Sequence, residues 1–417
     1  MKRLRLISIL LLLPMLASAQ LRKNEVAIEF KYSNGSYTAL IQRGGEPSRK
    51  KVLLENGQAI DELSKKATLY DDQNSRQAYQ LILAPLAKYL HKGDKIFFTS
   101  AGQLHFINLA ALTDEQGHRC LERYSFYRLS DITRPVKDEP LTPRYMPFIL
   151  YGGMNYMADP DLMVENCWFL HQDPFFPEEK PVDRFPDRPG WGISDIDFGT
   201  AEDGTRAGYS TLTSSRGEIK FIYHLNRFQA TVNTGPEALE ERFKQDTRRD
   251  HAYVMHVSTH SFQTNIPPRS KTMGLTEEEI IYRSCGLLFS GAGHTLQGEK
   301  MPYNMNDGLL YADEIAHLDM HNCELMVVGA CNTALGRVSQ NGVIGLQSAF
   351  KKAGAKTLLL TLWSVNDRAT SYFMQQFYTY LGKGKSKYES FNRARQDMIK
   401  SKDFSDPVYW APFILLD

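Results

Sequence analysis

Apolar positions in the second half of the chain alternate between two periods, one typical of strands and one typical of helices. Strand-like runs are expected at 229–233, 252–257, 286–289, 324–328, 356–363 and 410–416. Helix-like spacing lies between them, at 218–227, 236–245, 312–318, 342–353, 368–381 and 386–400. Strands that alternate with helices predict an α/β fold with a mostly parallel sheet and helices on both faces. Functional groups in such a sheet lie beyond the carboxyl ends of the strands.

The first half of the chain carries fewer regular patterns. Strand-like runs at 25–30 and 37–43 flank Ser33-Asn34-Gly35-Ser36, a turn signal, and predict a hairpin. A helical period covers 69–90. Further strands are expected at 95–99 and 147–151. Between 157 and 209, prolines and acidic residues accumulate, which predicts a long surface insertion.

Composition limits the class of protein. A chain of 417 residues is long enough for two or three domains with a core that needs no disulfide support. Its 49 basic and 48 acidic residues give a net charge of +1, which offers no electrostatic footprint for nucleic acid. The five cysteines have no Cys-x-x-Cys spacing, so a zinc knuckle or a disulfide framework is not expected. They are Cys120, Cys167, Cys285, Cys323 and Cys331.

The first residues have the pattern of a secretory signal peptide. A basic start precedes an apolar run at 6–13, and Ala17-Ser18-Ala19 forms a small-x-small cleavage site. The apolar run is too short to span a bilayer. We therefore expect cleavage after Ala19, a secreted or periplasmic protein, and no membrane contact afterwards. An odd number of cysteines in that compartment predicts at least one free thiol.

Two predicted strand ends carry reactive side chains. The first strand runs out into Ser258-Thr259-His260, and the second into Gly329-Ala330-Cys331. A neighbouring imidazole converts a weakly nucleophilic thiol into a thiolate, so the two could form a catalytic dyad. Each residue alone is more often inert, the cysteine as a small core residue and the histidine as a surface group. Their equivalent positions at two strand ends favour the dyad.

Other chemistries find less support. His256 and His260 lie four residues apart, but along a strand their side chains are separated by more than about 10 Å, which argues against a shared metal. No Gly-x-Ser-x-Gly elbow and no glycine-rich phosphate loop is present. We therefore expect neither a metal nor a cofactor.

The motifs around the two strand ends resemble the CHAT family of caspase-like cysteine peptidases, whose clan includes caspases, separases and gingipains. The resemblance covers nearly the whole chain after the signal peptide and is most specific from 258 to 413. The segments that carry it are Thr259-His260-Ser261, Asp307-Gly308-Leu309-Leu310-Tyr311-Ala312-Asp313-Glu314-Ile315, Gly329-Ala330-Cys331-Asn332-Thr333, Ala353-Gly354-Ala355, Leu362-Trp363-Ser364-Val365-Asn366-Asp367 and Tyr409-Trp410-Ala411-Pro412-Phe413. Upstream, Gly102-Gln103-Leu104-His105-Phe106 is similar to another family segment.

The resemblance implies a caspase-like α/β fold and, by analogy with separases, two lobes. We expect a signal peptide at 1–19, an entry hairpin at 20–65, a degenerate lobe at 66–210 and an active lobe at 211–417. The proline-rich insertion, 157–210, belongs to the first lobe. Two hypotheses for it stay open: it covers the cleft until it is cut or displaced, or it is a solvated surface loop.

The resemblance also implies residue roles. Cys331 would attack the scissile carbonyl, and His260 would protonate the leaving amine. The backbone N–H groups of Cys331 and Ser261 would hold the oxyanion. Ser261 stands where the family has glycine, which would cost about 1 kcal/mol if the position needs a positive φ.

Three further residues are expected to contact substrate. Asp367 matches a separase acid that pairs with arginine at the cleaved position, and a carboxylate there would select Arg or Lys. The alternative is that Asp367 caps the helix beginning at Arg368. Trp363 would line the same pocket, or else belong to the core. Asn332, which replaces the family's glutamate, would lie beside the nucleophile, or else be a turn residue.

Two functions from different classes follow. The first is an extracytoplasmic cysteine endopeptidase that acts on a protein or peptide, after Arg or Lys, with activation by a partner or by proteolysis. The second is a catalytically silent caspase-like scaffold that binds peptides or proteins. The presence of both His260 and Cys331 favours the enzyme.

Overall fold

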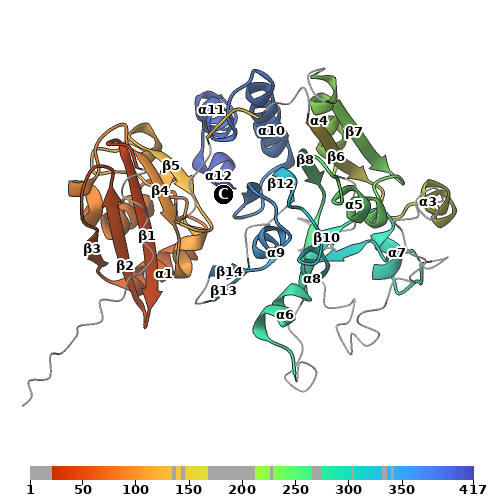
Figure 1. Ribbon diagram of the computed structural model, residues 1–417, viewed down its shortest axis with the longest axis horizontal. Helices are drawn as coiled ribbons and strands as arrows, with labels where there is room; N and C mark the ends of the chain where they lie inside the picture. Colours follow the sequence, from red (N-terminus) through yellow and green to blue (C-terminus); the bar gives the residue numbers. More distant parts are fainter. Residues whose placement is uncertain are drawn as a thin grey trace, which may run out of the picture. The chain divides into compact units, whose positions relative to one another are not determined.

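The computed structural model describes residues 21–133, 138–141, 146–167, 212–225, 229–264, 274–301, 305–330, 336–339 and 342–417. The chain forms two compact units (Figure 1). The first contains Met1–Ala101 and Leu112–Lys137, and the second contains Gly102–Ala111 and Asp138–Asp417. The units divide elsewhere than at the predicted boundary of 210/211. The assignment of a degenerate first lobe stays a prediction.

The first unit contains a sheet in the order β3-β2-β1-β4-β5. Its strands are β1 (Glu25–Ser33), β2 (Ser36–Arg43), β3 (Lys50–Leu54), β4 (Lys95–Thr99) and β5 (Ser125–Arg128). β1 and β2 form the predicted hairpin, in antiparallel register down to Ser33↔Ser36. Asn34 and Gly35 have φ values of 51° and 76°, as a two-residue primed turn requires. β4 pairs in parallel with both β1 and β5.

The long helix predicted over 69–90 is wrong in its second half. The structure has α2 (Asp72–Ile82), followed by a separate 3₁₀ helix, η1 (Ala84–Tyr89). Pro85 lies in the first turn of η1, where its missing N–H ends the α-helical hydrogen-bond ladder. α1 (Gly57–Ser64) and η4 (Cys120–Glu122) complete the unit. A buried ion pair between Arg43 and Asp94 joins the end of β2 to the start of β4.

The second unit contains a sheet in the order β16-β15-β12-β8-β6-β7. Its strands are β6 (Pro147–Met154), β7 (Gln229–Gly235), β8 (Tyr253–Ser258), β12 (Cys323–Val328), β15 (Leu358–Thr361) and β16 (Phe413–Leu416). All neighbouring strands are parallel except β15 and β16. The predicted mostly parallel α/β sheet is confirmed.

Helices cover both faces of this sheet, as predicted. In β8, His256 points to one face and contacts α4 (Thr213–His224) and α10 (Asp367–Gly382). Its neighbours Met255 and Val257 join the core cluster on the other face. That cluster includes side chains of α5 (Glu240–Asp246), α8 (Ala312–Ile315) and α9 (Leu346–Lys352). α11 (Lys387–Lys400) packs against α10 (Figure 1).

Two smaller sheets lie in the same unit. One has the order β11-β10-β9, formed by β9 (Ser261–Gln263), β10 (Cys285–Leu288) and β11 (Leu309–Tyr311). The other pairs β13 (Arg337–Ser339) with β14 (Gly342–Ile344). The helix predicted from 342 is therefore wrong over its first residues, because 342–344 are hydrogen-bonded as a strand. The strand predicted from 410 begins only at Phe413, since Trp410 ends the short helix α12 (Pro407–Trp410).

The segment that resembles the upstream family motif belongs to the second unit. It forms η2 (Gly102–Phe106) and η3 (Leu109–Ala111). The Asn108 side chain donates to the carbonyl oxygen of Ala411 at 2.8 Å, next to α12. Small helices complete this unit: α3 (Pro160–Cys167), α6 (Glu277–Tyr282) and α7 (Ala292–Leu296). α3 lies within the predicted insertion, whose residues 168–210 are outside the described ranges.

Three cysteines of the described residues have free thiols, and the predicted compartment stays a prediction. Cys120, Cys285 and Cys323 are free, and burial raises the pKa of each thiol to about 12, so they are unreactive at neutral pH. The side chain of Cys167 is not described. Within the described ranges, no helix combines the length and the apolar character that crossing a bilayer requires. The signal peptide at 1–19 is outside those ranges and stays a prediction.

Candidate functional site

The two predicted strand ends are neighbours in the second unit. β8 and β12 are neighbouring strands (Figure 1). They pair in parallel, with Val257 opposite Val328. The Gly329 N–H then donates to the carbonyl oxygen of Val257 at 2.8 Å. The chain that enters Cys331 therefore runs beside the chain that enters His260. Cys331 and Asn332 themselves are outside the described residues.

His260 is half-buried, and its backbone is fixed on both sides. Its carbonyl oxygen accepts from the Leu288 N–H at 2.9 Å, in the first residues of the β9–β10 pairing. Its own N–H donates to the hydroxyl of Tyr156 at 3.3 Å. The two rings lie 5.4 Å apart, with 42° between their planes. Sequence patterns gave no signal for Tyr156, which lies 104 positions away.

Ser261 is placed without strain. It begins β9 and lies opposite Leu287 of β10. Among the described residues other than glycine, positive φ values occur only at Asn34 and Asn56. The serine in place of the family's glycine therefore carries no left-handed backbone penalty. Its backbone role at an oxyanion stays a prediction.

Asp367 is the first residue of α10, but it does not cap that helix. The cap is Asn366, whose Oδ1 accepts from the N–H groups of Arg368 at 3.0 Å and Ala369 at 3.4 Å. Asp367 Oδ2 instead accepts from the Ser214 N–H at 3.0 Å, in the first turn of α4. The capping alternative is thus wrong for α10, and the carboxylate links the starts of two helices. Its role toward substrate stays a prediction.

A pocket of about 370 Å³ lies beside Asp367. Its lining includes Ser214, which donates to Asp367, and Arg368, the next residue in the chain. Tyr372 and Phe404 form an aromatic wall with their rings 5.3 Å apart. The pocket therefore lies between the start of α4, the first half of α10 and residues 401–404, and Asp367 is not among its lining residues.

Trp363 follows β15 and is partly buried against the core cluster. Its indole N–H donates to the carbonyl oxygen of Val408 in α12 at 3.3 Å. These contacts agree with the core alternative for this side chain, while a role in lining a substrate pocket stays a prediction.

A buried polar triad lies beneath the strand ends. His256 Nε2 is 2.8 Å from Glu218 Oε1, and His256 Nδ1 is 3.0 Å from the Tyr378 hydroxyl. All three residues are at most 1% exposed. Burial raises the pKa of Tyr378 well above its ordinary value, so its hydroxyl stays protonated and donates to Nδ1. The signal available in the sequence was a histidine inside an apolar strand, since a buried polar group needs partners.

Glu218 also lies close to the backbone before Cys331. A Cβ placed on Gly329 would be 3.7 Å from Glu218 Oε1 and 3.5 Å from Ser258 Oγ. These are ordinary van der Waals distances, so a Cβ would fit at this position without displacing its neighbours. Within the described ranges, no group of three His, Cys, Asp or Glu side chains is arranged to hold a metal ion.

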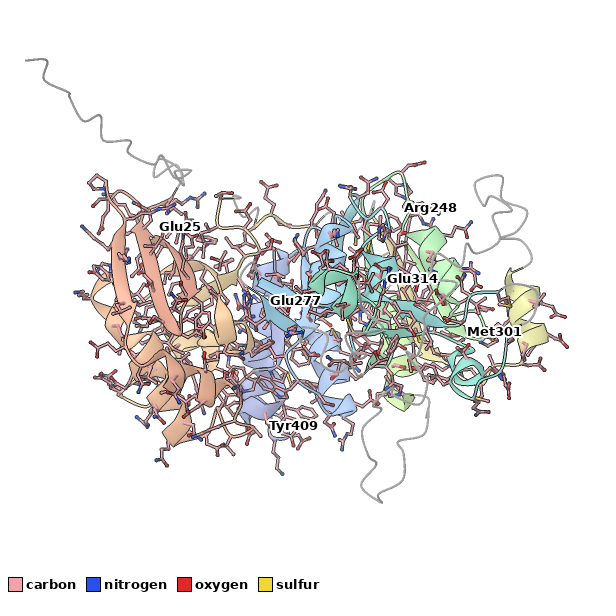
Figure 2. The ribbon with its side chains drawn as sticks, turned by 90° about the horizontal axis from the view of Figure 1, so that it is seen from below. Glu25, Arg248, Glu277, Met301, Glu314 and Tyr409 are labelled. Carbon is pink, nitrogen blue, oxygen red and sulfur yellow. The ribbon has the colours of Figure 1, made fainter. Side chains whose placement is uncertain are left out.

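The residues of the motif at 307–315 make structural contacts, within the motif itself and with α5. Asp307 Oδ1 accepts from the Leu309 N–H at 2.9 Å, and Gly308 has a φ of 76°. Glu314, labelled in Figure 2, accepts from the Tyr311 N–H and pairs with Lys244 at 2.9 Å. Burial opposes the charge of Lys244, but its carboxylate neighbours, Glu314 among them, raise its pKa above the ordinary value. The amine therefore stays charged and joins α5 to α8.

Comparison with known proteins places the chain in a family. The CHAT domain family model matches residues 72–416. Tetratricopeptide repeat protein 28 of Mus musculus is 35% identical over 108 residues, and that of Homo sapiens is 34% identical over 108 residues. Each match covers 26% of this chain and 4% of the relative, so this chain corresponds to a small part of those proteins.

Two solved structures are similar at low sequence identity. The Saccharomyces cerevisiae separase–securin complex is 8% identical with a TM-score of 0.45, over 94% of this chain and 30% of that chain. The Arg-specific cysteine proteinase gingipain R is 8% identical with a TM-score of 0.39, over 86% of this chain and 73% of that one. The family model, by contrast, matches most of the sequence, including both motif-bearing strand ends. The chain belongs to the CHAT domain family.

Proposed function

We propose that the protein is a cysteine endopeptidase that hydrolyses peptide bonds with a His260/Cys331 dyad. The observation that carries the proposal is the pairing of β8 with β12, which continues as a hydrogen bond from Gly329 to Val257. It brings the chain leading to the thiol beside the chain leading to the imidazole. Both lie at the carboxyl edge of a parallel sheet, where α/β folds place their chemistry.

The dyad would act in two steps. The Cys331 thiolate attacks the scissile carbonyl carbon, and the backbone N–H groups of Cys331 and Ser261 stabilise the oxyanion. His260, protonated by the thiol, gives its proton to the leaving amine as the C–N bond breaks. Water then hydrolyses the thioester, with His260 accepting a proton from the water and returning one to the thiol. Such positioned proton transfer contributes about 10²–10⁴-fold to the rate.

The proposed substrate has Arg or Lys before the cut. Asp367 is partly buried and held by the Ser214 N–H, and its neighbours Ser214 and Arg368 line a pocket of about 370 Å³. A carboxylate anchored in this way can receive a guanidinium through two hydrogen bonds, which favours Arg over Lys. Trp363 and Asn332 are proposed as neighbours of the bound chain.

The proposal extends to the setting of the enzyme. Residues 1–19 would direct export, which would give a secreted or periplasmic protein that meets proteins or peptides as substrates. The insertion at 157–210 would be the place where cutting, or a partner, activates the enzyme if the protein is made in a latent form.

A matched cleavage assay tests the proposal. The chain from Gln20 onwards and its Cys331→Ala variant are incubated with fluorogenic peptides that differ at the residue before the cut. Cys285→Ala is the control, because it removes a free thiol of raised pKa outside the dyad. We expect cleavage after Arg or Lys that only Cys331→Ala abolishes. Absence of cleavage, also after nicking of the insertion, would favour the scaffold function instead.

A second variant tests the specificity. Asp367→Asn keeps an oxygen that can accept from Ser214 but removes the charge. We expect kcat/KM for Arg peptides to fall by at least about 100-fold, as loss of a charge-assisted bidentate pair requires. Peptides with an uncharged residue at this position should be cut at the unchanged, low rate. An equal loss for all peptides would refute the assignment of Asp367.

A further inference from the structure

Tyr156 contacts the candidate base from a distant part of the chain. It lies in the loop after β6, and its side chain is 1% exposed. Its hydroxyl accepts from the His260 N–H at 3.3 Å, and its ring faces the imidazole ring at 5.4 Å. Burial raises the pKa of this hydroxyl to about 12, so it keeps its proton. The proton must therefore be donated to another acceptor.

The hydrogen bonds around Tyr156 run in a single direction. Thr259 Oγ1 uses its only proton to donate to the carbonyl oxygen of Leu288 at 2.5 Å. Thr259 Oγ1 must therefore accept from the Tyr156 hydroxyl, which lies 3.0 Å away. The resulting chain runs from the His260 N–H to Tyr156, then to Thr259, and ends at Leu288. The Leu288 N–H returns a bond to the His260 carbonyl at 2.9 Å, so the circuit closes on His260.

The Tyr156 loop is anchored to the segment that follows β10. The N–H groups of Gly291 and Gly293 donate to the carbonyl oxygens of Asn155 and Tyr156, at 3.1 and 2.8 Å. The approach is close, because a Cβ on Gly293 would lie 2.7 Å from the Tyr156 carbonyl oxygen. The same segment directly follows Leu288, the last residue of β10, whose N–H holds the His260 carbonyl oxygen. One short stretch of chain thus fixes both the tyrosine and the histidine.

We propose that Tyr156 is a positioning residue for His260, and that its hydroxyl fixes the backbone from which the imidazole reaches the reacting groups. This inference rests on the proposed dyad. The Thr259 hydroxyl donates to the Leu288 carbonyl oxygen and accepts from Tyr156, so Thr259 belongs to the same chain of hydrogen bonds. Proton transfer between positioned groups is sensitive to displacement, and an error of about 1 Å costs about 10²-fold.

The test compares single hydroxyl removals. Tyr156→Phe keeps the ring against His260 and removes only the hydroxyl. The control is Tyr253→Phe, which removes an equally buried hydroxyl at the opposite end of β8, where it donates to the Thr247 carbonyl oxygen at 3.0 Å. We expect Tyr156→Phe to lower kcat by about tenfold or more, with KM within about twofold of the wild type. The control should leave both constants unchanged.

Two variants at Thr259, the next residue in the chain of hydrogen bonds, separate an effect on the position of His260 from an effect on stability. Thr259→Val breaks the chain of hydrogen bonds and should lower kcat like Tyr156→Phe, whereas Thr259→Ser keeps the hydroxyl and should restore it. Urea unfolding of each variant, with rates expressed per folded molecule, removes any effect of lost stability. If kcat of Tyr156→Phe per folded molecule equals that of Tyr253→Phe, the inference is wrong.

A readout without catalysis keeps the inference separate from the proposed function. Cleavage by the wild type that Cys331→Ala abolishes decides whether the dyad works. Hydrogen exchange of the His260 amide decides whether Tyr156 holds it. We expect exchange at least about tenfold faster in Tyr156→Phe than in Tyr253→Phe, because the amide loses its acceptor. Equal exchange would overturn the inference, whether or not peptides are cut.

Discussion

The buried triad of Glu218, His256 and Tyr378 predicts that two substitutions, each strongly destabilising alone, should destabilise the protein much less when they are combined. Glu218→Leu would leave the His256 Nε2–H without an acceptor in a site that is 0% exposed. An orphaned buried group together with a lost charge-assisted bond costs about 3 kcal/mol. His256→Leu would leave the Glu218 carboxylate, whose side chain is 2% exposed, without its donor. An uncompensated buried charge costs about 3–5 kcal/mol.

The double variant removes both polar groups at once. Only the Tyr378 hydroxyl is then unpaired, which costs about 1–2 kcal/mol. Additive effects would give a loss of about 6–8 kcal/mol. We therefore expect the double variant to be more stable than either single variant, with a coupling of about 4 kcal/mol or more. The physical reason is that two apolar side chains of similar size replace a pair that is costly only when it is broken.

Urea unfolding of the four proteins, followed by far-UV circular dichroism, measures this coupling. The matched control is the exposed pair of Lys352 and Glu278, at 2.7 Å with side chains 54% and 44% exposed. Its cycle should give below about 1 kcal/mol, because solvent screens the pair. The reasoning is refuted if the loss of stability in the double variant equals the sum of the two single losses within about 0.5 kcal/mol. The contributions of Glu218 and His256 to stability would then be independent of each other.

Further predictions concern glycines and a buried acid. Gly308→Ala should destabilise the protein by about 1–3 kcal/mol, because φ is 76° and the new Cβ would lie 2.6 Å from the Ala292 nitrogen. The control Gly329→Ala should change the free energy of unfolding by no more than about 0.5 kcal/mol. Thermal unfolding compares the two variants. Burial opposes the charge of Asp114, but a backbone N–H and the Arg123 guanidinium outweigh burial and hold its pKa below the ordinary 3.8. A depressed pKa adds stability above the unfolded value that is lost as the pH falls through the folded value. Asp114→Asn should therefore cost about 1–2 kcal/mol at pH 7, and its deficit should narrow below about pH 4, as urea unfolding across pH would show.

Local patterns predicted the strands and helices of the second unit well, because each buried element repeats its own apolar period. The wrong predictions lie where tertiary contacts determine the local structure. At 342–344 the chain pairs with 337–339 as a strand, although the residues from 346 onwards are helical. Asn366 and Asp367 are both good capping residues, so the sequence could not say which one caps α10. Packing turns Asp367 toward the Ser214 N–H instead.

Local sequence patterns predicted part of the candidate site in the same way, whereas its other contacts join residues that are distant in the sequence. The strand ends and their order along the chain predicted where His260 would lie. No local pattern links His260 to Tyr156. None links Glu218 to His256 either, since the two residues are 38 positions apart. Such contacts depend on the order of strands and on the helices packed against them. A single sequence contains those only implicitly.

The motif at 307–315 shows how distant residues support the site. It lies between His260 and Cys331 in the sequence, and it contacts β10 and the segment that follows β10. The Gly308 carbonyl accepts from the Phe289 N–H at 2.7 Å, and a glycine there lets the chain pass against Ala292. Phe289 directly follows Leu288, the residue that holds the backbone of His260. Gly308 is therefore linked to the candidate base through two backbone hydrogen bonds, which the peptide bond between Leu288 and Phe289 joins. A side chain at Gly308 should lower catalysis without touching a reacting atom.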